Sequence, residues 1–145
     1  ESLEYSSDKP GRSIQLAELS AGERRTQQRA AILTAIREAP GPLTVREILE
    51  HASRDAPSLG QATVYRNLKM LTDAGEVRCI TLPDGQNRYE SANLPHHHHF
   101  RCRQCERTFD LPGCAVGVPD GATLPGGFHV ESHEVTFYGL CPECS

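Results

Sequence analysis

The sequence lacks any apolar run that approaches the length of a transmembrane helix or of a signal-peptide core. Only 37% of its 145 residues are hydrophobic, which excludes a membrane protein and allows one ordinary core or two small ones. We therefore expect a cytoplasmic protein. Cytosolic thiols stay reduced, so the six cysteines are expected to be metal ligands or free thiols rather than disulfides.

The sequence also lacks an excess of positive charge. Its net charge of −4 argues against a generally basic nucleic-acid coat. The charges are unevenly distributed, since residues 12–72 contain nine Lys and Arg against six Asp and Glu, whereas residues 73–145 contain five against ten. This asymmetry suggests that one part faces a polyanion and another part faces cations.

The usual signs of catalysis are missing too, because no activated nucleophile, no paired catalytic carboxylates and no phosphate-cradling glycine loop can be recognised. An enzyme is therefore not expected. Two alternatives of other classes stay open. One is a metal-dependent hydrolase whose histidines hold an open zinc site with Glu90 as the base, and the other is a zinc-storage or adaptor protein.

Helical patterns dominate the first half of the chain. Residues 1–11 are polar and aperiodic, so we expect a disordered tail there. A first helix is predicted from Glu23 to Glu38, where Ala30, Leu33 and Ile36 have the spacing of one helical face. The run EAPGP that follows ends this helix through proline and glycine.

Two further helices follow in sequence. Thr44 is placed to cap the second helix, and Glu47 three residues later completes a capping box. The run QATVYRNLKMLTDAG predicts a third helix that ends at Gly75, with Val64 and Leu68 on its buried face.

The pattern after the third helix changes to that of a β-hairpin. EVRCITL and NRYE read as its strands and PDGQ as its turn, which would pair Leu82 with Asn87 and place Cys79 opposite Glu90. Three short helices and a hairpin make a winged helix, which we predict for residues 12–90.

In a winged helix, the helix before the hairpin reads DNA. Its face away from the core, with arginines from the first helix, offers groups that bind phosphates and base edges. Charge alone would fit a solvated helical bundle equally well, but the helix-turn-helix followed by a wing favours DNA. The expected DNA-binding residues are Arg24, Arg25, Arg29, Gln61, Thr63, Tyr65, Arg66 and Lys69.

Two Cys-x-x-Cys pairs in the second half predict a structural zinc site. Cys102 and Cys105 form the first pair, and Cys141 and Cys144 form the second. Four thiolates close a tetrahedral site and leave no open position for a substrate water.

Four consecutive histidines stand just before the first cysteine pair. On a strand, His97 and His99 project to one face while His96 and His98 project to the other, so this run can serve two different metal sites. If the hairpin places Cys79 beside Glu90, these two residues join His97 and His99 in a mixed set that favours zinc over harder, six-coordinate metals.

The motifs ATVYRNLKML, GEVRCITLPDGQNRYE, HHHHFRCRQC and FYGLCPEC occur in this order, and through them the chain resembles the ferric uptake regulator family of metal-dependent repressors. The resemblance implies an α+β fold and a homodimer. A winged-helix DNA-binding domain would be followed by a hinge at residues 91–95 and by a small α/β dimerisation and metal-binding domain at residues 96–145.

The resemblance also implies metal ligands at matching positions. Cys102, Cys105, Cys141 and Cys144 match the family's structural zinc site. Glu90, His97, His99 and Asp110 match its regulatory site in the hinge, and His96, His98 and His133 match a third site in the dimerisation domain.

Several positions depart from the family pattern. Iron-sensing members place a histidine just ahead of the second helix, where this chain has Gly41, and Cys79 makes the chain similar to the zinc uptake regulator branch. A glycine- and proline-rich segment stands where members have a helix, so we expect that helix to be missing or shortened. It normally supplies a carboxylate to the third site; only Asp120 is nearby, and Cys114 has no assigned role.

These expectations combine into metal-gated DNA binding. Zinc in the hinge would fix the two domains in one orientation, so that the dimer binds operator double-stranded DNA at a fixed spacing of its reader helices. We predict repression of zinc-uptake genes, and leave activation of zinc-storage genes open. Sensing of iron, manganese or peroxide is the nearest alternative, and whether Cys79 or Asp110 completes the regulatory site also stays open.

Overall fold

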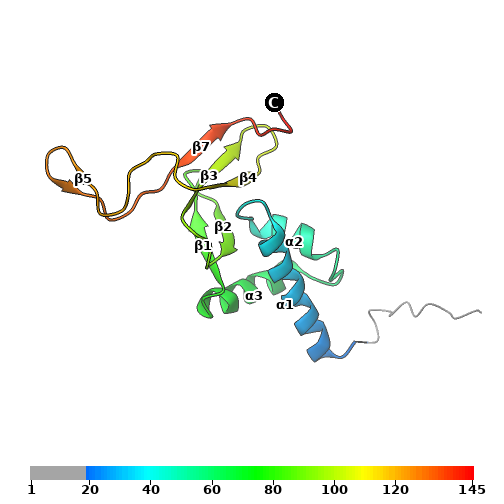
Figure 1. Ribbon diagram of the computed structural model, residues 1–145. Helices are drawn as coiled ribbons and strands as arrows, with labels where there is room; N and C mark the ends of the chain where they lie inside the picture. Colours follow the sequence, from blue (N-terminus) through cyan, green and yellow to red (C-terminus); the bar gives the residue numbers. More distant parts are fainter. Residues whose placement is uncertain (1–18) are drawn as a thin grey trace, which may run out of the picture.

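The computed structural model describes residues 19–145, so the predicted tail at residues 1–11 lies outside the described part (Figure 1). Three helices come first, and strands follow. The helices are α1 (Ala21–Glu38), α2 (Val45–Ala52) and α3 (Gln61–Asp73). The strands are β1 (Val77–Thr81), β2 (Asn87–Ser91), β3 (His97–Cys102), β4 (Thr108–Pro112), β5 (Thr123–Leu124), β6 (Phe128–His129) and β7 (Thr136–Gly139). None of the helices in the described range is long and apolar enough to span a membrane.

Capping residues and a glycine next to the helices determine where the helices begin and end. Ser20 caps α1, because its side chain accepts a hydrogen bond from the backbone N–H of Glu23. The predicted capping box of α2 is confirmed, with Thr44 and Glu47 each accepting from the other's backbone N–H. Helix α3 ends just before Gly75, whose φ of 73° suits glycine.

The apolar core lies among the three helices and the start of β1. Ile48, Val64 and Leu68 are fully or almost fully buried, as their helical spacing predicted for the last two. The predicted core face of α1 was partly wrong. Ile36 is buried as predicted and shares its face with Ile32, four residues earlier, whereas Ala30 is exposed and Leu33 is only partly buried.

The predicted hairpin is confirmed, but its predicted register was wrong by one residue. Thr81 pairs with Asn87, Cys79 with Tyr89 and Arg78 with Glu90. The turn closes earlier than PDGQ, since the N–H of Gly85 donates to the carbonyl of Leu82, and Gly85 has a positive φ of 79°. The connection therefore contains one more residue than expected, and a one-residue slip exchanges the faces of all side chains on a strand.

The second half contains a sheet of three strands in the order β4-β3-β7, with β3 antiparallel to β4 and parallel to β7. A segment between β4 and β7 projects away from this sheet and contains the small hairpin of β5 and β6 (Figure 1). Residues 96–145, all of which are described, contain no helix. The expectation that this region lacks the family's helix is thus confirmed.

The two halves touch through the segment before α2. The backbone N–H of Asp110 donates to the carbonyl of Pro40 at 2.8 Å, and Leu43 forms a β-bridge with Tyr89. Gly41 lies so close to the backbone of Thr108 that any Cβ would collide with it. These contacts hold the segment before α2 against both the wing hairpin and β4, at the border between the helical half and the sheet.

Candidate metal centres

The four cysteines of the two Cys-x-x-Cys pairs come together at one end of the three-stranded sheet. Cys102 is the last residue of β3, and Cys141 follows β7 by two residues, so the parallel pairing of these strands brings the pairs together. The Sγ atoms of Cys105 and Cys141 are 3.9 Å apart. Two thiolates on one zinc ion, each at about 2.3 Å, lie about 3.8 Å apart in a tetrahedron, so the cluster has the size that zinc requires.

The surroundings of this cluster favour a thiolate at Cys102. Burial raises the pKa of its thiol, but backbone N–H groups of Cys105 and Cys141 outweigh burial and hold the pKa at about 6. The N–H of Cys141 lies 3.4 Å from the Sγ of Cys102. A metal requires its cysteine ligands deprotonated, so these backbone donors prepare the site.

The four histidines divide between the two faces of the sheet, as their alternation predicted. His97 and His99 point toward Glu90 of the wing and Asp110 of β4, and the four donor atoms lie within 4.8 Å of one another. His96 and His98 point to the other face, toward His133 and Cys114. One strand thus contributes to two separate clusters.

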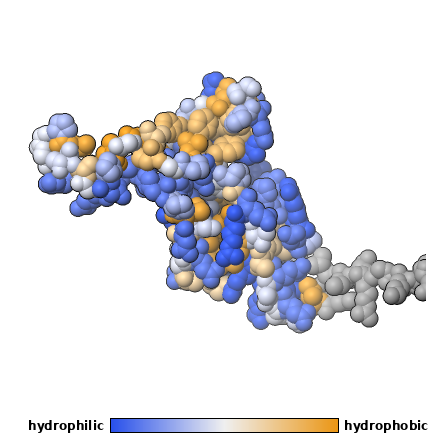
Figure 2. All heavy atoms as spheres, in the orientation of Figure 1, coloured by the Kyte–Doolittle hydropathy of each residue, from blue (hydrophilic) through white to orange (hydrophobic). Residues whose placement is uncertain are grey.

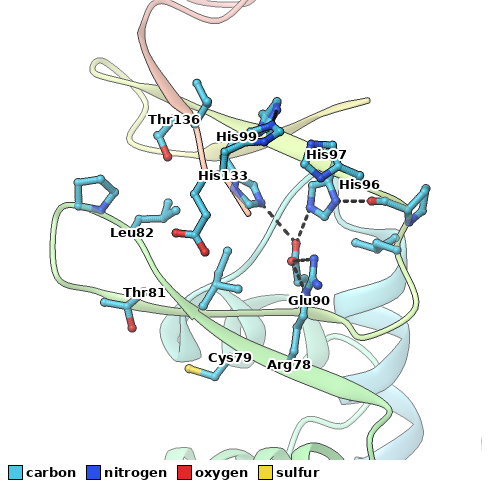
Figure 3. Close-up of a pocket in the computed structure, with 17 residues that line it drawn as sticks. Arg78, Cys79, Thr81, Leu82, Glu90, His96, His97, His99, His133 and Thr136 are labelled. Atoms are coloured by element: carbon cyan, nitrogen blue, oxygen red, sulfur yellow. Dashed lines mark hydrogen bonds and ion pairs between the residues drawn. The ribbon is translucent and has the colours of Figure 1, made fainter. Parts of the chain in front are cut away.

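The first of these clusters joins the two halves of the molecule, and we call Glu90, His97, His99 and Asp110 the hinge cluster. Figure 3 shows its first three members. The Nε2 of His97 is 3.0 Å from a Glu90 oxygen and 3.5 Å from an Asp110 oxygen. The Nε2 of His99 is 3.5 Å from each of the same two oxygens. A tetrahedron with metal–ligand distances near 2.1 Å has edges of about 3.4 Å, close to these four separations.

Arg78 orients the carboxylate of Glu90. Its Nε and its terminal nitrogen lie 2.7 Å and 2.6 Å from one oxygen, which leaves the other oxygen to face the histidines. Burial raises the pKa of Glu90, but the neighbouring side chains of His99, Arg78 and His97 outweigh burial and lower the pKa to about 2. Burial, together with the Glu90 charge, raises the pKa of Asp110. The cluster is therefore a place of concentrated negative charge that a cation would stabilise.

Two buried atoms of the hinge cluster are placed as metal ligands would be. The Nε2 of His99 and the Oδ1 of Asp110 are buried and have no hydrogen-bond partner. Buried polar atoms without partners cost free energy, and such atoms converge where an ion binds. Two imidazoles and two carboxylates suit zinc, and they also suit iron or manganese.

Cys79 does not belong to the hinge cluster. The shifted register pairs it with Tyr89, so it points to the face of the hairpin opposite Glu90, and its side chain is exposed. Figure 3 shows its sulfur turned away from the histidines. The prediction that Cys79 lies beside Glu90 was wrong, and Asp110 is the residue that the fold brings to the fourth position.

The second cluster contains Cys114, which the sequence left without a role. Its Sγ lies 3.3 Å from the Nε2 of His98 and 3.3 Å from the Nε2 of His133. These two nitrogens are 3.2 Å apart, and the ring of His96 lies against both imidazoles. No spacing rule links Cys114 to the histidines, because they meet through an irregular segment. Asp120 lies at the edge, 3.6 Å from the Nδ1 of His133.

The predicted DNA-binding residues lie on the outer faces of α1 and α3. All eight are exposed except Thr63, which is half-buried. Arg66 donates a hydrogen bond to Thr63, and Arg29 reaches across to Asn67 of α3. Both helices therefore present polar side chains, several of them basic, outside the apolar core, and the Arg29–Asn67 contact joins the two helices there.

Comparisons with known proteins agree with this architecture. A model of the Ferric uptake regulator family matches residues 20–138. The peroxide-responsive repressor PerR of Staphylococcus aureus is 34% identical over 125 residues, which cover 86% of this chain and 84% of that protein. The solved structure of a zinc-bound manganese uptake regulator has a TM-score of 0.65 at 23% identity, covering 83% of this chain and 95% of that one. FurB from M. tuberculosis, a zinc uptake regulator, is 31% identical over 86% of this chain and 98% of its own, with a TM-score of 0.47.

Proposed function

Because this chain belongs to the ferric uptake regulator family, we propose that it is a zinc-responsive regulator of transcription whose dimer binds operator DNA when the hinge cluster holds its ion. The observation that carries the proposal is the composition of the hinge cluster, since Glu90 comes from the wing and His97 and Asp110 come from the sheet. A bound divalent cation would offset the charge of two carboxylates and tie these elements together.

The two halves supply the parts that such a switch needs. Glu90 would be the ligand from the wing, and through it the helical half would respond to the metal. His97 and His99 would be the ligands from the sheet. When all four side chains share one ion, the wing and the sheet keep one relative orientation. An ion that prefers this orientation shifts the population toward it by its difference in affinity.

A dimer would turn this orientation into DNA affinity. DNA offers major grooves at intervals of one helical turn, so two reader helices must stand at a matching distance. The edge strand β7 displays exposed Phe137 and Tyr138, and apolar residues gather over this sheet (Figure 2). We propose this region as part of the contact between two copies, acting together on operator DNA in the cytoplasm.

Zinc is proposed because the four imidazole–carboxylate separations, 3.0 to 3.5 Å, are close to those of a tetrahedral site. We further propose repression of zinc-uptake genes, with activation of zinc-storage genes as an additional effect at other promoters. Iron or manganese is the second candidate, favoured by the two carboxylates and by the position of Cys79 outside the cluster. Peroxide sensing, as in the name of the S. aureus relative, would require a redox-active ion in the same place.

The hydrolase alternative is disfavoured by the state of its base. Glu90 was the only obvious general base, yet it is buried, paired with Arg78 and held at a pKa of about 2. Such a carboxylate is a weak proton acceptor near neutral pH. A storage or adaptor role would not explain the exposed basic side chains of α1 and α3.

The test is a selection of DNA duplexes from a random pool by the zinc-loaded protein, followed by titrations of the selected duplex in zinc, manganese or ferrous iron at controlled free concentrations. We expect zinc to promote DNA binding at a lower free metal concentration than manganese or ferrous iron. If only manganese or ferrous iron promotes DNA binding, that metal replaces zinc as the proposed regulatory ion. Absence of any metal-dependent enrichment would reject the regulator.

A further inference from the structure

The wing hairpin contacts the sheet at a second place besides the hinge cluster. Asp84 lies in the turn between β1 and β2, and its Oδ2 is 3.0 Å from a terminal nitrogen of Arg101 in β3. Arg101 follows His97 and His99 at every second position of the strand, so the three side chains project from the same face. The face of β3 that supplies the histidines to the hinge therefore also presents a cation to the wing.

The carboxylate of Asp84 is held in place by its own hairpin. Both terminal nitrogens of Arg88 donate to it, at 3.0 and 2.8 Å, and the backbone N–H of Gln86 donates to it at 3.0 Å. Arg88 is 1% exposed, so its guanidinium needs this carboxylate to compensate a buried charge. An acceptor fixed in this way loses little conformational entropy when Arg101 approaches, which strengthens the pair relative to one between two free surface side chains.

The two contacts lie at opposite ends of the hairpin. Glu90 is next to the last residue of β2, at the open end, whereas Asp84 is in the turn that closes the hairpin. A hairpin held only at Glu90 could still rotate about that point, and a second contact near the turn prevents this rotation. The hinge ion and the Asp84–Arg101 pair together therefore define one orientation of the wing on the sheet, and only the first of them requires a metal.

We propose that Asp84 and Arg101 form a clasp, a metal-independent contact whose residues position Glu90 opposite the hinge histidines before the ion binds. This inference rests on the metal gating proposed above. A gated hinge is mainly open without metal, and its apparent affinity for zinc is reduced in proportion to the small fraction of closed molecules. The clasp raises that fraction. It therefore sets the zinc concentration at which the protein responds, although neither of its residues is a metal ligand.

The charges at the clasp give it a distinctive response to mutation. Arg88 from the wing and Arg101 from the sheet both contact the Oδ2 of Asp84. The carboxylate thus lies between two cations, one from each half, which repel one another when it is removed. Loss of Asp84 should therefore open the halves more than loss of Arg101 does. Once Asp84 is lost, the additional loss of Arg101 should close the halves again, because it removes the repulsion.

Zinc affinity of the hinge is measured on the full chain by competition with a chromophoric chelator, with zinc kept in the four-cysteine site. The hinge ion is identified as the zinc that His97→Ala removes. Arg101→Gln should weaken its binding about 3- to 10-fold, and Asp84→Asn should weaken it further. Arg101→Gln added to Asp84→Asn should restore part of the affinity. Arg101→Lys, which keeps the charge, should retain most of it, and Arg103→Gln, at an exposed arginine nearby, is the control.

A second readout needs no metal at the hinge. The N–H of Asp110 donates across the border to the carbonyl of Pro40, so its NMR chemical shift reports the fraction of closed molecules. Arg101→Gln and Asp84→Asn should both lower this fraction. An unchanged fraction in both variants, or a further loss when Arg101→Gln is added to Asp84→Asn, would overturn the clasp. If the wild type binds no zinc that depends on His97, the metal gating fails, and the Asp110 shift alone decides whether the clasp exists.

Discussion

The two halves of this molecule are stabilised in different ways. The helical half buries a continuous apolar cluster that runs from Ala31 to Val77. The strand half buries Cys102, Cys141, His98 and Thr108, and no large apolar side chain of residues 96–145 is fully buried. The helical half therefore gains its stability from apolar burial, and we expect the strand half to depend on its candidate metal ligands.

From this difference we expect a bound metal ion to act on the strand half without unfolding the helical half. Apolar burial is present at any metal concentration, whereas sites of metal donors gain their stability only when ligands are deprotonated and an ion is bound. The hinge cluster lies where the two kinds of structure meet, with Glu90 on one side and His97 on the other. A responsive site is best placed at such a border.

The largest effect is expected from the four-cysteine cluster. Cys102→Ser should remove about one zinc ion per chain and unfold the sheet, because a structural zinc site contributes about 10–16 kcal/mol, comparable to a whole domain's stability. The helices should persist. Metal analysis, circular dichroism and sedimentation would measure the three properties. A stable dimer with full zinc content would show that the cluster is not structural.

The helical half should lose stability when its apolar core is disturbed, without losing zinc. Ile48→Ala removes a fully buried side chain and should lower the free energy of unfolding by about 2–5 kcal/mol, while zinc content stays unchanged. Denaturation followed by helical circular dichroism measures the loss. Val116→Ala, at an exposed position between β4 and β5, is the control and should change stability by less than about 0.5 kcal/mol. Loss of zinc together with the helices would mean that the halves fold as one unit.

A third variant addresses the DNA surface. Arg66→Ala or Tyr65→Ala should weaken binding to the selected duplex by about tenfold or more, since each contact to a phosphate or base contributes about 1–3 kcal/mol. Zinc content and dimerisation should not change, because both side chains are exposed. Arg103→Ala, an exposed arginine of the strand half, serves as the control. If all three variants bind equally, the DNA surface lies elsewhere.

A smaller, pH-dependent effect is expected where the wing's turn contacts the sheet. Asp84 pairs with the buried Arg88 at 2.8 Å and with Arg101 of β3 at 3.0 Å. The hydrogen bond from Arg88 lowers the pKa of Asp84 from 3.8 to about 2. Its contribution to stability is therefore complete above pH 3.8 and is lost as the pH falls through about 2.

Asp84→Asn should accordingly lower the free energy of unfolding by about 1–3 kcal/mol near neutral pH. The difference from the wild type should shrink as the wild-type carboxyl is protonated. Thermal or urea unfolding at a series of pH values measures this convergence. A gap that stays constant down to the lowest accessible pH would show that the charge of Asp84 does not contribute.

The smallest effect is expected from Cys79→Ser. The thiol is exposed and lies outside all three clusters, so zinc-dependent DNA binding should remain within about twofold of the wild type. The titration that measures Arg66→Ala also measures this variant. A clear loss of zinc response would show that Cys79 reaches the hinge ion in the DNA-bound form, and would return the thiolate to the regulatory site.

Much of this arrangement could be predicted from local patterns. The capping residues and apolar spacing predicted three helices, and the two-residue period of strands predicted that His97 and His99 would separate from His96 and His98. These features depend only on near neighbours in the sequence. The paired Cys-x-x-Cys motifs were informative for the same reason, because each pair is one local turn.

The errors arose where one residue or one irregular segment decided the outcome. The turn that closes at Gly85 added one residue to the hairpin connection and moved Cys79 to the other face. Cys114 joined the histidines through the irregular segment between β4 and β7, whose path no periodicity describes. Gly41 marked a missing histidine in the sequence, but only the structure shows that the backbone of Thr108 fills that space.

The most direct test of the hinge compares His97→Ala with His98→Ala. The two histidines are neighbours on β3 and point to opposite faces, so either change removes one imidazole and only His97 belongs to the hinge cluster. Affinity for the selected duplex is measured against free zinc, with the four-cysteine zinc verified in each protein. We predict that His97→Ala loses the zinc-dependent gain in affinity at concentrations that saturate the wild type, and that His98→Ala retains most of it. Equal responses of the two variants, or a normal zinc response of His97→Ala, would contradict metal gating at the hinge.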